Sequence, residues 1–334
     1  MSLVKFLKKF LIIGTVALLC WSCSYLPTIE SNPWQFVSVE TEGNLLDVAF
    51  TDDPNHGWIV GSETTLLETT DGGETWKPVS LELGQDNIRF TSVSFSGSEG
   101  WIVGEPSILL HTTDGGQNWN SILLSSKLPG SPYNIVALGP RSAEMATDVG
   151  AIYVTQDGGL NWKALVEEAV GIVRNVARSE DGRYITVSAK GNFYSTWTPG
   201  ERAWQPYNRY SSKRLENMGF GADGRLWMLA RGGEIRFTDA EENTEWGEAI
   251  NPEFATSWGF LDLAYRTPEE IWVSGGSGNL LCSFDGGETW LKDQQVEEVP
   301  GNFNRIQFIN SEKGFILGQR GTLLRYTPES SETA

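Results

Sequence analysis

Four related stretches punctuate the chain, and the first of them reads Thr70-Asp71-Gly72-Gly73-Glu74-Thr75-Trp76. The others are Thr113-Asp114-Gly115-Gly116-Gln117-Asn118-Trp119, Gln156-Asp157-Gly158-Gly159-Leu160-Asn161-Trp162 and Phe284-Asp285-Gly286-Gly287-Glu288-Thr289-Trp290. In each stretch the Asp carboxylate can accept backbone N–H groups across a tight turn, for which the glycines supply positive φ angles. The terminal Trp offers a large ring for burial between packed elements. We therefore expect a repeated structural turn carried by Asp71, Trp76, Asp114, Trp119, Asp157, Trp162, Asp285 and Trp290.

Tryptophans continue the same spacing beyond these four stretches. Intervals of 42 to 44 residues separate Trp34, Trp76, Trp119, Trp162, Trp204, Trp246 and Trp290. A repeat of this length with strand-like content is typical of the blades of a β-propeller. The four stretches resemble the Asp-box, or BNR repeat, of sialidases and related propellers. Because the segments before Trp204 and Trp246 lack it, we interpret the motif as structural, not as catalytic or substrate-binding.

Each repeat contains four short segments with strand-like sequences. In the repeat that ends near Trp76 they are residues 46–50, 57–61, 66–69 and 76–79, with Gly, Asp and Asn between them. The last repeat stops after residues 323–326, and the first Trp segment, residues 33–37, has no repeat before it. Pairing these two fragments would close the ring and remove its free sheet edges. The sequence thus predicts an all-β, seven-bladed propeller over residues 32–328, with four antiparallel strands per blade and a short tail over residues 329–334.

The first residues have the pattern of a secretory signal. Three lysines precede an apolar run over residues 10–19, which is too short to span a bilayer. The sequence Cys20-Trp21-Ser22-Cys23 follows, and a small residue directly before Cys23 is typical of a bacterial lipoprotein cleavage site. We expect a signal peptide over residues 1–22, lipidation of Cys23 and a tether over residues 23–31, with ordinary cleavage nearby as the alternative. Acyl chains would hold the domain on a membrane surface.

Cysteine and histidine are too sparse for a metal site or a disulfide framework. Once Cys20 is removed and Cys23 acylated, only Cys282 is left, and its apolar surroundings predict a small buried residue. The two histidines, His56 and His111, fall in different repeats without a partner motif. No zinc site, catalytic triad or cofactor is therefore predicted.

Charge is distributed unevenly along the chain. The 334 residues carry a formal charge of −18, which becomes −21 once the three lysines of residues 1–22 are removed. Such an acidic chain is not expected to bind nucleic acid, because a phosphate backbone would repel it. Residues 174–236, however, contain 11 basic and 6 acidic side chains. We therefore expect a cationic sector on an anionic body.

Alternate loops of a four-stranded, up-and-down blade lie on opposite faces of the disc. All Asp-boxes join third and fourth strands, so they share one face. The loops before first strands, and those between second and third strands, share the other face and carry nine basic residues: Arg89, Arg174, Lys190, Arg209, Lys213, Arg214, Arg231, Arg305 and Arg320. Charge steers association, and arginine can bind carboxylates in a bidentate manner. We interpret these residues as a partner-binding patch, with ordinary solvated surface charge as the alternative.

Segments outside the Asp-boxes carry a resemblance to a known family. They are Asn32-Pro33-Trp34-Gln35, Gly171-Ile172-Val173-Arg174-Asn175, Asn192-Phe193-Tyr194-Ser195-Thr196-Trp197, Leu229-Ala230-Arg231-Gly232-Gly233, Ile271-Trp272-Val273-Ser274-Gly275-Gly276 and Leu317-Gly318-Gln319-Arg320-Gly321. With the lipoprotein-like start, they resemble the photosystem II assembly and stability factor family of cyanobacteria and plastids over essentially the whole mature chain. The resemblance implies a non-enzymatic, seven-bladed propeller that binds the newly made precursor of the D-type reaction-centre subunit and early assembly intermediates, and that promotes assembly, and also repair, of the reaction centre.

The resemblance also implies an arginine-rich patch. It carries over to Arg174, Arg209, Arg214, Arg231 and Arg320, whereas Lys213 stands where an arginine is expected and loses the planar fork. The bipartite transit peptide and the insertion of the plastid forms do not appear. A cyanobacterial form is therefore expected, lipid-anchored on the lumenal side of the thylakoid membrane or the periplasmic side of the plasma membrane. The expected protein is a monomer without cofactor, metal or nucleic-acid partner.

The sequence also allows two other functions. A sialidase-like glycoside hydrolase would need acidic residues near the propeller axis, for which Glu105 and Asp148 are candidates. The Arg-Ile-Pro start of sialidases is absent, and the nearest string is Asn304-Arg305-Ile306-Gln307. A general periplasmic interaction scaffold with an unrelated client differs from the photosynthetic role only through the family-like segments.

Overall fold

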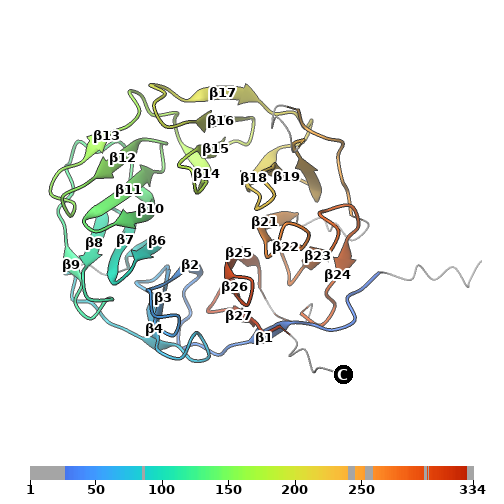
Figure 1. The fold of residues 1–334 in the computed structure, drawn as a ribbon, viewed down its shortest axis with the longest axis horizontal. Coiled ribbons are helices and arrows are strands. Elements are labelled where there is room, and N and C mark those ends of the chain that lie inside the picture. The colour runs from blue at the N-terminus through green and yellow to red at the C-terminus, as the bar shows by residue number, and fades with distance from the viewer. Residues whose placement is uncertain are drawn as a thin grey trace, which may run out of the picture.

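The computed structural model describes residues 27–84, 87–239, 245–252, 259–296, 299 and 301–328. In these residues the chain forms seven antiparallel sheets around a central axis (Figure 1). No helix in the described part of the chain is long and apolar enough to cross a membrane. The prediction of an all-β, seven-bladed propeller is confirmed.

Seven blades, A to G, follow one another along the chain, and the first strand of each lies nearest the axis. Blade A contains β2 (Leu45–Phe50), β3 (Gly57–Gly61), β4 (Leu66–Thr69) and β5 (Lys77–Pro78). Blade B contains β6 (Arg89–Ser96), β7 (Glu99–Glu105), β8 (Ile108–Thr112) and β9 (Asn120–Ser121). Blade C contains β10 (Pro132–Gly139), β11 (Ser142–Thr147), β12 (Ile152–Thr155) and β13 (Lys163–Ala164).

The remaining blades repeat this plan. Blade D contains β14 (Val173–Arg178), β15 (Tyr184–Ser188), β16 (Phe193–Trp197) and β17 (Gln205–Asn208). Blade E contains β18 (Leu215–Phe220), β19 (Leu226–Ala230) and β20 (Glu234–Phe237), and the bridges Ile235–Ile250 and Thr238–Trp246 cover its outer edge. Blade F contains β21 (Phe260–Tyr265), β22 (Ile271–Gly275), β23 (Leu280–Ser283) and β24 (Leu291–Lys292). Blade G contains β25 (Phe303–Asn310), β26 (Lys313–Gly318) and β27 (Leu323–Tyr326).

The N-terminal strand β1 (Trp34–Phe36) completes blade G. It pairs antiparallel with β27, with Trp34 opposite Tyr326. The Trp34 ring is buried and lies edge-on to Trp272 of blade F, with 5.4 Å between ring centroids. The predicted closure of the ring by the two ends of the propeller is therefore confirmed.

Each blade packs against its two neighbours, which explains why the second strands are so apolar. Every residue of β3, β15, β19 and β22 is buried. A strand covered on both sides has no solvent-facing positions, so its sequence loses the polar alternation of a half-exposed strand.

The Asp-box turn is held by its own side chains. Asp114 accepts hydrogen bonds from the Thr112 hydroxyl at 2.7 Å and from the Asn118 backbone N–H at 3.0 Å. Hydrogen bonds from Asn118 and Thr112 lower the pKa of the Asp114 carboxyl to about 2. Gly115 and Gly116 have φ angles of 78° and 95°, which favour glycine. The same carboxylate-to-backbone bond recurs at Asp71, Asp157 and Asp285.

The tryptophans that end the Asp-boxes lie between blades. Trp76 is buried and lies edge-on to Phe315 of blade G, with 5.9 Å between ring centroids. Trp119 makes the same kind of contact with Trp58 of blade A at 5.7 Å. Each repeat therefore supplies both a turn and part of the interface to the preceding blade.

Candidate partner-binding surface

The loops of the disc divide into two faces, as their hydrogen bonds show. On one face an Asp-box contacts the loop between first and second strands, where the Gly72 N–H donates to the Asn55 carbonyl at 2.9 Å. On the other face the loop between second and third strands contacts the next blade, where the Thr64 N–H donates to the Ile88 carbonyl at 2.6 Å. We call the first surface the Asp-box face and the second the cationic face.

Six of the nine predicted basic residues come together on the cationic face of blades D and E. They are Arg174, Lys190, Arg209, Lys213, Arg214 and Arg231, which form the cationic cluster. The Arg231 N–H donates to the Arg214 carbonyl at 2.8 Å, and the Arg214 guanidinium donates to the Ala189 carbonyl, beside Lys190, at 3.1 Å. The Arg174 guanidinium donates to the Leu215 carbonyl at 2.8 Å. Direct contacts therefore hold these loops next to one another.

Members of the cationic cluster differ in how far their charges are already paired. Arg174 forms an ion pair with Glu216 at 2.5 Å. Across the part of the chain that the structure describes, Lys190, Arg209 and Arg231 form neither an ion pair nor a side-chain hydrogen bond. The cluster thus contains an arginine held by an ion pair, Arg174, and side chains without an ion pair to any described residue, such as Arg231, whose charge can attract a partner.

The other three predicted residues lie elsewhere on the ring. Arg89 of blade B and Arg305 of blade G line the central cavity. Arg305 forms an ion pair with Asp47 of blade A at 3.2 Å. Arg320 lies in the turn between β26 and β27, where its N–H donates to the Asn44 side chain at 3.3 Å. Arg89, Arg174 and Arg305 therefore lie within the first strands β6, β14 and β25 and not in loops, and the nine residues do not form one patch.

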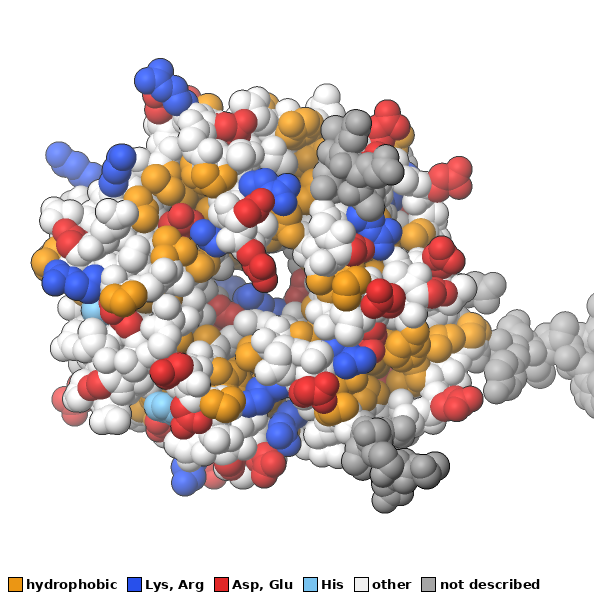
Figure 2. All heavy atoms as spheres, viewed as in Figure 1, with side chains coloured by type: hydrophobic (Ala, Val, Ile, Leu, Met, Phe, Trp, Pro, Cys, Tyr) orange, Lys and Arg blue, Asp and Glu red, His pale blue; other side chains and the backbone are white. Residues whose placement is uncertain are grey.

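The axis of the disc contains a polar cavity of about 550 Å³, and Figure 2 shows basic and acidic side chains lying in its opening. Arg174 of the cationic cluster also lines it. Equivalent positions of the seven inner strands are polar: Asp47, Ser92, Asn134, Asn175, Asn217, Asp262 and Arg305. Asn217 bonds to Asn175 at 2.6 Å and to Asp262 at 2.9 Å. Burial raises the pKa of Asp262 to about 6, although Arg305 opposes the shift.

Exposed aromatic side chains beside the cationic cluster were not predicted from the sequence. Tyr207 of β17 is 46% exposed and Tyr210 is 62% exposed. Tyr207 stacks on Tyr194 with 5.2 Å between ring centroids, and Arg236 of blade E lies 5.3 Å from the centre of the Tyr210 ring. The strand itself could be read from the sequence, but the exposure of its tyrosines depends on how blades D and E pack.

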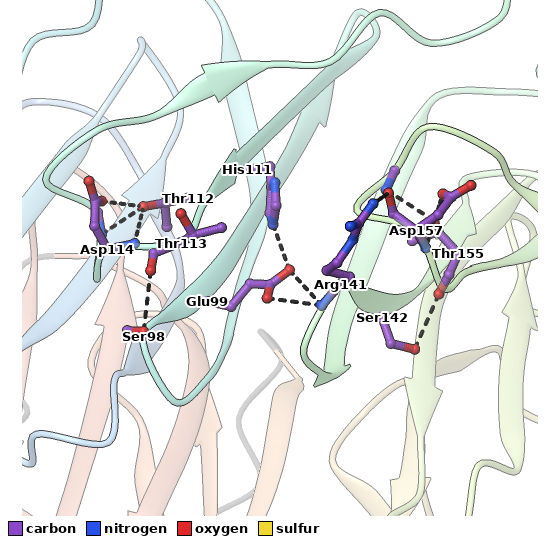
Figure 3. A network of polar contacts seen from close by, with 12 residues as sticks. Ser98, Glu99, His111, Thr112, Thr113, Asp114, Arg141, Ser142, Thr155 and Asp157 are labelled. Atoms are coloured by element: carbon purple, nitrogen blue, oxygen red, sulfur yellow. Dashed lines mark hydrogen bonds and ion pairs between the residues drawn. The ribbon is translucent and has the colours of Figure 1, made fainter.

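The histidines are engaged within the fold. His111 bonds through Nε2 to Glu99 at 2.7 Å, and Glu99 also accepts the Arg141 backbone N–H at 2.8 Å (Figure 3). His56 bonds in the same way to Glu68 at 2.8 Å. Each histidine therefore has a glutamate of its own blade as partner.

The other candidate residues that the sequence offered are two acids and two cysteines. Glu105 faces Arg89 at 3.4 Å, and Asp148 accepts the Ser131 N–H at 2.8 Å. Cys282 is buried, which raises the pKa of its thiol. Within the described ranges no three His, Cys, Asp or Glu side chains are grouped so that they could hold a metal ion. Cys23 lies outside the described residues.

Comparison with known proteins identifies the family. The family model described as photosynthesis system II assembly factor YCF48 matches residues 26–327. The chain is 60% identical over 334 residues to the photosystem II assembly lipoprotein Ycf48 of Trichormus variabilis, covering 100% of this chain and 98% of that protein. The solved structure of YCF48 bound to D1 peptide matches with a TM-score of 0.89 and 55% identity, covering 91% of this chain and 100% of that one. YCF48 from Cyanidioschyzon merolae matches with a TM-score of 0.83 and 41% identity, covering 89% of this chain and 99% of that one.

These matches span the propeller and not only its generic Asp-boxes. The resemblance carried by the segments outside the Asp-boxes is therefore confirmed. The chain belongs to the photosynthesis system II assembly factor YCF48 family.

Proposed function

We propose that this chain is a non-enzymatic photosystem II assembly factor that binds the newly made precursor of the D-type reaction-centre subunit through the cationic cluster. Membership of the YCF48 family supports the role in assembly. The similar structure of YCF48 bound to D1 peptide supports a peptide of this subunit as the partner. The six basic residues that gather on the cationic face of blades D and E support the choice of this surface.

The unpaired cations are the observation that carries this proposal. Because Lys190, Arg209 and Arg231 form no ion pair with any described residue, a carboxylate can bind them without first breaking an internal salt bridge. Arginine adds two parallel hydrogen bonds to the charge attraction. The chain as a whole carries a formal charge of −18, so most of its surface repels an acidic peptide and this sector attracts it.

The surroundings of the cluster indicate what else the partner should contain. The Arg174–Glu216 ion pair holds one arginine in place, and Tyr207 and Tyr210 expose aromatic surface beside the cations. Aromatic side chains at a binding surface bury large apolar area while keeping a polar tip in water. A peptide with both acidic and apolar residues therefore fits the surface better than a purely acidic one.

Charge reversal tests the proposed surface. We expect the triple variant Lys190→Glu/Arg209→Glu/Arg231→Glu to weaken binding of a D1 peptide by more than about tenfold, because three attractions become repulsions. Fluorescence anisotropy with a labelled peptide at low and at physiological salt measures the loss. Circular dichroism before the titration establishes that the variant is folded.

A matched control separates local from overall charge. The variant Lys77→Glu/Lys127→Glu/Lys163→Glu makes the same change in net charge at exposed positions outside the cationic cluster. It should bind the peptide almost as well as the unchanged protein at physiological salt. Equal loss in both variants, or full binding by a folded cluster variant, would contradict the proposal.

The proposed function includes a lipid anchor on Cys23, on the lumenal side of the thylakoid membrane. The Ser22-Cys23 pattern and the lipoprotein name of the 60% identical relative support it. A Cys23→Ala variant should move from the membrane fraction to the soluble fraction, because it lacks the thiol to which the membrane-binding acyl chain is attached. Mass spectrometry of the N-terminal peptide provides the check, and an unacylated peptide from membrane-bound protein would contradict the anchor.

The non-enzymatic part of the proposal has its own test. Glu105 and Asp148 are the acids that a glycoside hydrolase would use, and both already accept a contact from a neighbouring residue. We expect no hydrolysis of sialosides or oligosaccharides. Turnover that disappears in Glu105→Gln or Asp148→Asn would show an enzyme instead.

A further inference from the structure

The segment before the propeller is attached to the outer edge of blade F. Thr28 forms a parallel bridge with Lys292 of β24. The Lys292 N–H donates to the Pro27 carbonyl at 3.0 Å, and the Ile29 N–H donates to the Lys292 carbonyl at 3.1 Å. Ile29 also packs against the apolar cluster between blades F and G. The chain is therefore fixed to the rim of the disc from Pro27 onward, next to β24 in Figure 1.

The parallel pairing gives this attachment a direction. Strand β24 follows the Asp-box of blade F, so it runs from the Asp-box face toward the cationic face. Residues 27–29 run the same way along its edge. Pro27 is therefore the end of the paired segment nearest the Asp-box face.

The length of chain between Pro27 and Cys23 then limits where the lipid anchor can be. The two residues are four positions apart in the sequence. An extended chain covers at most about 3.5 Å per residue, so Cys23 lies within about 14 Å of Pro27. A domain of about 300 residues has a radius of gyration near 19 Å, which makes the disc about 50 Å across. So short a connection cannot reach the opposite rim.

We propose that the outer edge of blade F, at its Asp-box end, is the part of the disc that lies against the lipid surface, while the cationic face is turned away from it. The proposal rests on the lipid anchor proposed for Cys23 and goes beyond it by orienting the whole disc. The acidic side chains of the Asp-box face, among them the exposed Asp285 and Glu288, oppose a flat contact with anionic lipids. Contact through the edge leaves the cationic cluster accessible to a protein partner.

Energy transfer to the lipid surface tests this orientation. A single donor dye is placed at Glu288→Cys, at Ser277→Cys or at Leu123→Cys in the full acylated chain; Cys282 is buried and does not compete for the label. Glu288 lies at the Asp-box end of blade F, Ser277 at the cationic end of the same blade, and Leu123 is 97% exposed on blade B. The vesicles contain phosphatidylcholine, some phosphatidylglycerol and an acceptor dye on the lipid headgroups.

Transfer should decrease from Glu288→Cys to Ser277→Cys to Leu123→Cys, with the first at least about twice the last given the short connection and the size of the disc. Equal transfer from all three positions, or the reverse order, would overturn the proposed orientation while leaving the anchor intact. Failure of the acylated protein to float with the vesicles would overturn the anchor and the orientation together. Peptide binding by the cationic cluster is measured separately and does not depend on either result.

Two changes to the connection complete the test. A twelve-residue Gly-Ser insertion between residues 26 and 27 should abolish the difference between Glu288→Cys and Leu123→Cys, because the longer chain lets the disc turn. Ile29→Pro removes the N–H that bonds to the Lys292 carbonyl and should reduce the difference without detaching the protein. An unchanged difference in the insertion variant would mean that something other than the attached segment orients the disc.

Discussion

Blades A, B, C and F keep the Asp-box, whereas blades D and E lack it and carry the cationic cluster. In blade D the corresponding turn is closed by Glu201, whose carboxylate accepts the Thr198 N–H at 3.0 Å and whose carbonyl accepts the Trp197 indole at 3.0 Å. Trp204 is nevertheless buried, and its indole donates to the Gly150 carbonyl at 2.8 Å. A packed tryptophan is therefore kept in both kinds of blade, whereas the Asp-box turn can be replaced by a turn with other hydrogen bonds.

The two faces of the disc also differ in whether their charged side chains are used within the fold. Where the Asp-box is present, its carboxylate is used within the turn, as the three bonds accepted by Asp114 show. In blades D and E the departure from the repeat coincides with cations such as Arg231, on the opposite face, that form no ion pair with any described residue. The blades with the regular repeat stabilise the fold, and the candidate site lies on blades D and E, where the repeat is irregular.

The largest effect is expected from the tryptophans, in both kinds of blade. Trp76→Ala and Trp204→Ala should each lower the free energy of unfolding by about 3–5 kcal/mol, because each leaves a cavity between blades. Urea unfolding followed by circular dichroism measures both. A loss at Trp204 far below that at Trp76 would show that blades D and E depend less on this packing.

An intermediate effect is expected from the Asp-box carboxylate. Asp114→Ala removes the acceptor of the Thr112 and Asn118 hydrogen bonds and should cost about 1 kcal/mol of stability, as for a lost helix cap. Binding of the D1 peptide should not change, since Asp114 lies on the other face. Weaker binding by this variant would break the separation between the two faces.

A smaller effect is expected from a single unpaired cation. Arg231→Ala should weaken peptide binding by about threefold, the size typical of one exposed charge pair, and leave the unfolding free energy unchanged. Anisotropy titration and urea unfolding of the same preparation give both numbers. Lys77→Ala, which removes an exposed cation outside the cluster, is the matched control.

The smallest effect concerns acid stability. Hydrogen bonds from Asn118 and Thr112 lower the pKa of Asp114 from 3.8 to about 2. A carboxyl with a lowered pKa in the folded state contributes stability above about pH 4, and this contribution is lost as the pH falls toward 2. Asp114→Asn should therefore show a shallower loss of stability over this range in an acid titration followed by circular dichroism. An identical acid transition would mean that the turn does not prefer the charged form.

Local chemistry explains why much of this molecule could be predicted from its sequence. The Asp-box turn is made by residues within a few positions of one another, and the spacing of the tryptophans counts the blades. Up-and-down topology then assigns every loop to a face, so the loops of Lys190 and Arg231, both between second and third strands, belong to the same face. Ring closure followed from two incomplete repeats, and β1 does pair with β27.

Contacts between distant parts of the chain could not be predicted in this way. Arg305 belongs to the cavity and not to the cationic cluster because it pairs with Asp47, which is far away in the sequence but adjacent around the ring. The exposure of Tyr210 and the attachment of Thr28 to Lys292 also depend on how separate blades meet. The sequence by itself determined the repeat, the number of blades and the face of each loop, since these depend on near neighbours. Only the tertiary structure decided which cations lie together, which remain unpaired and where the chain joins the rim, because closing the ring brings remote residues into contact.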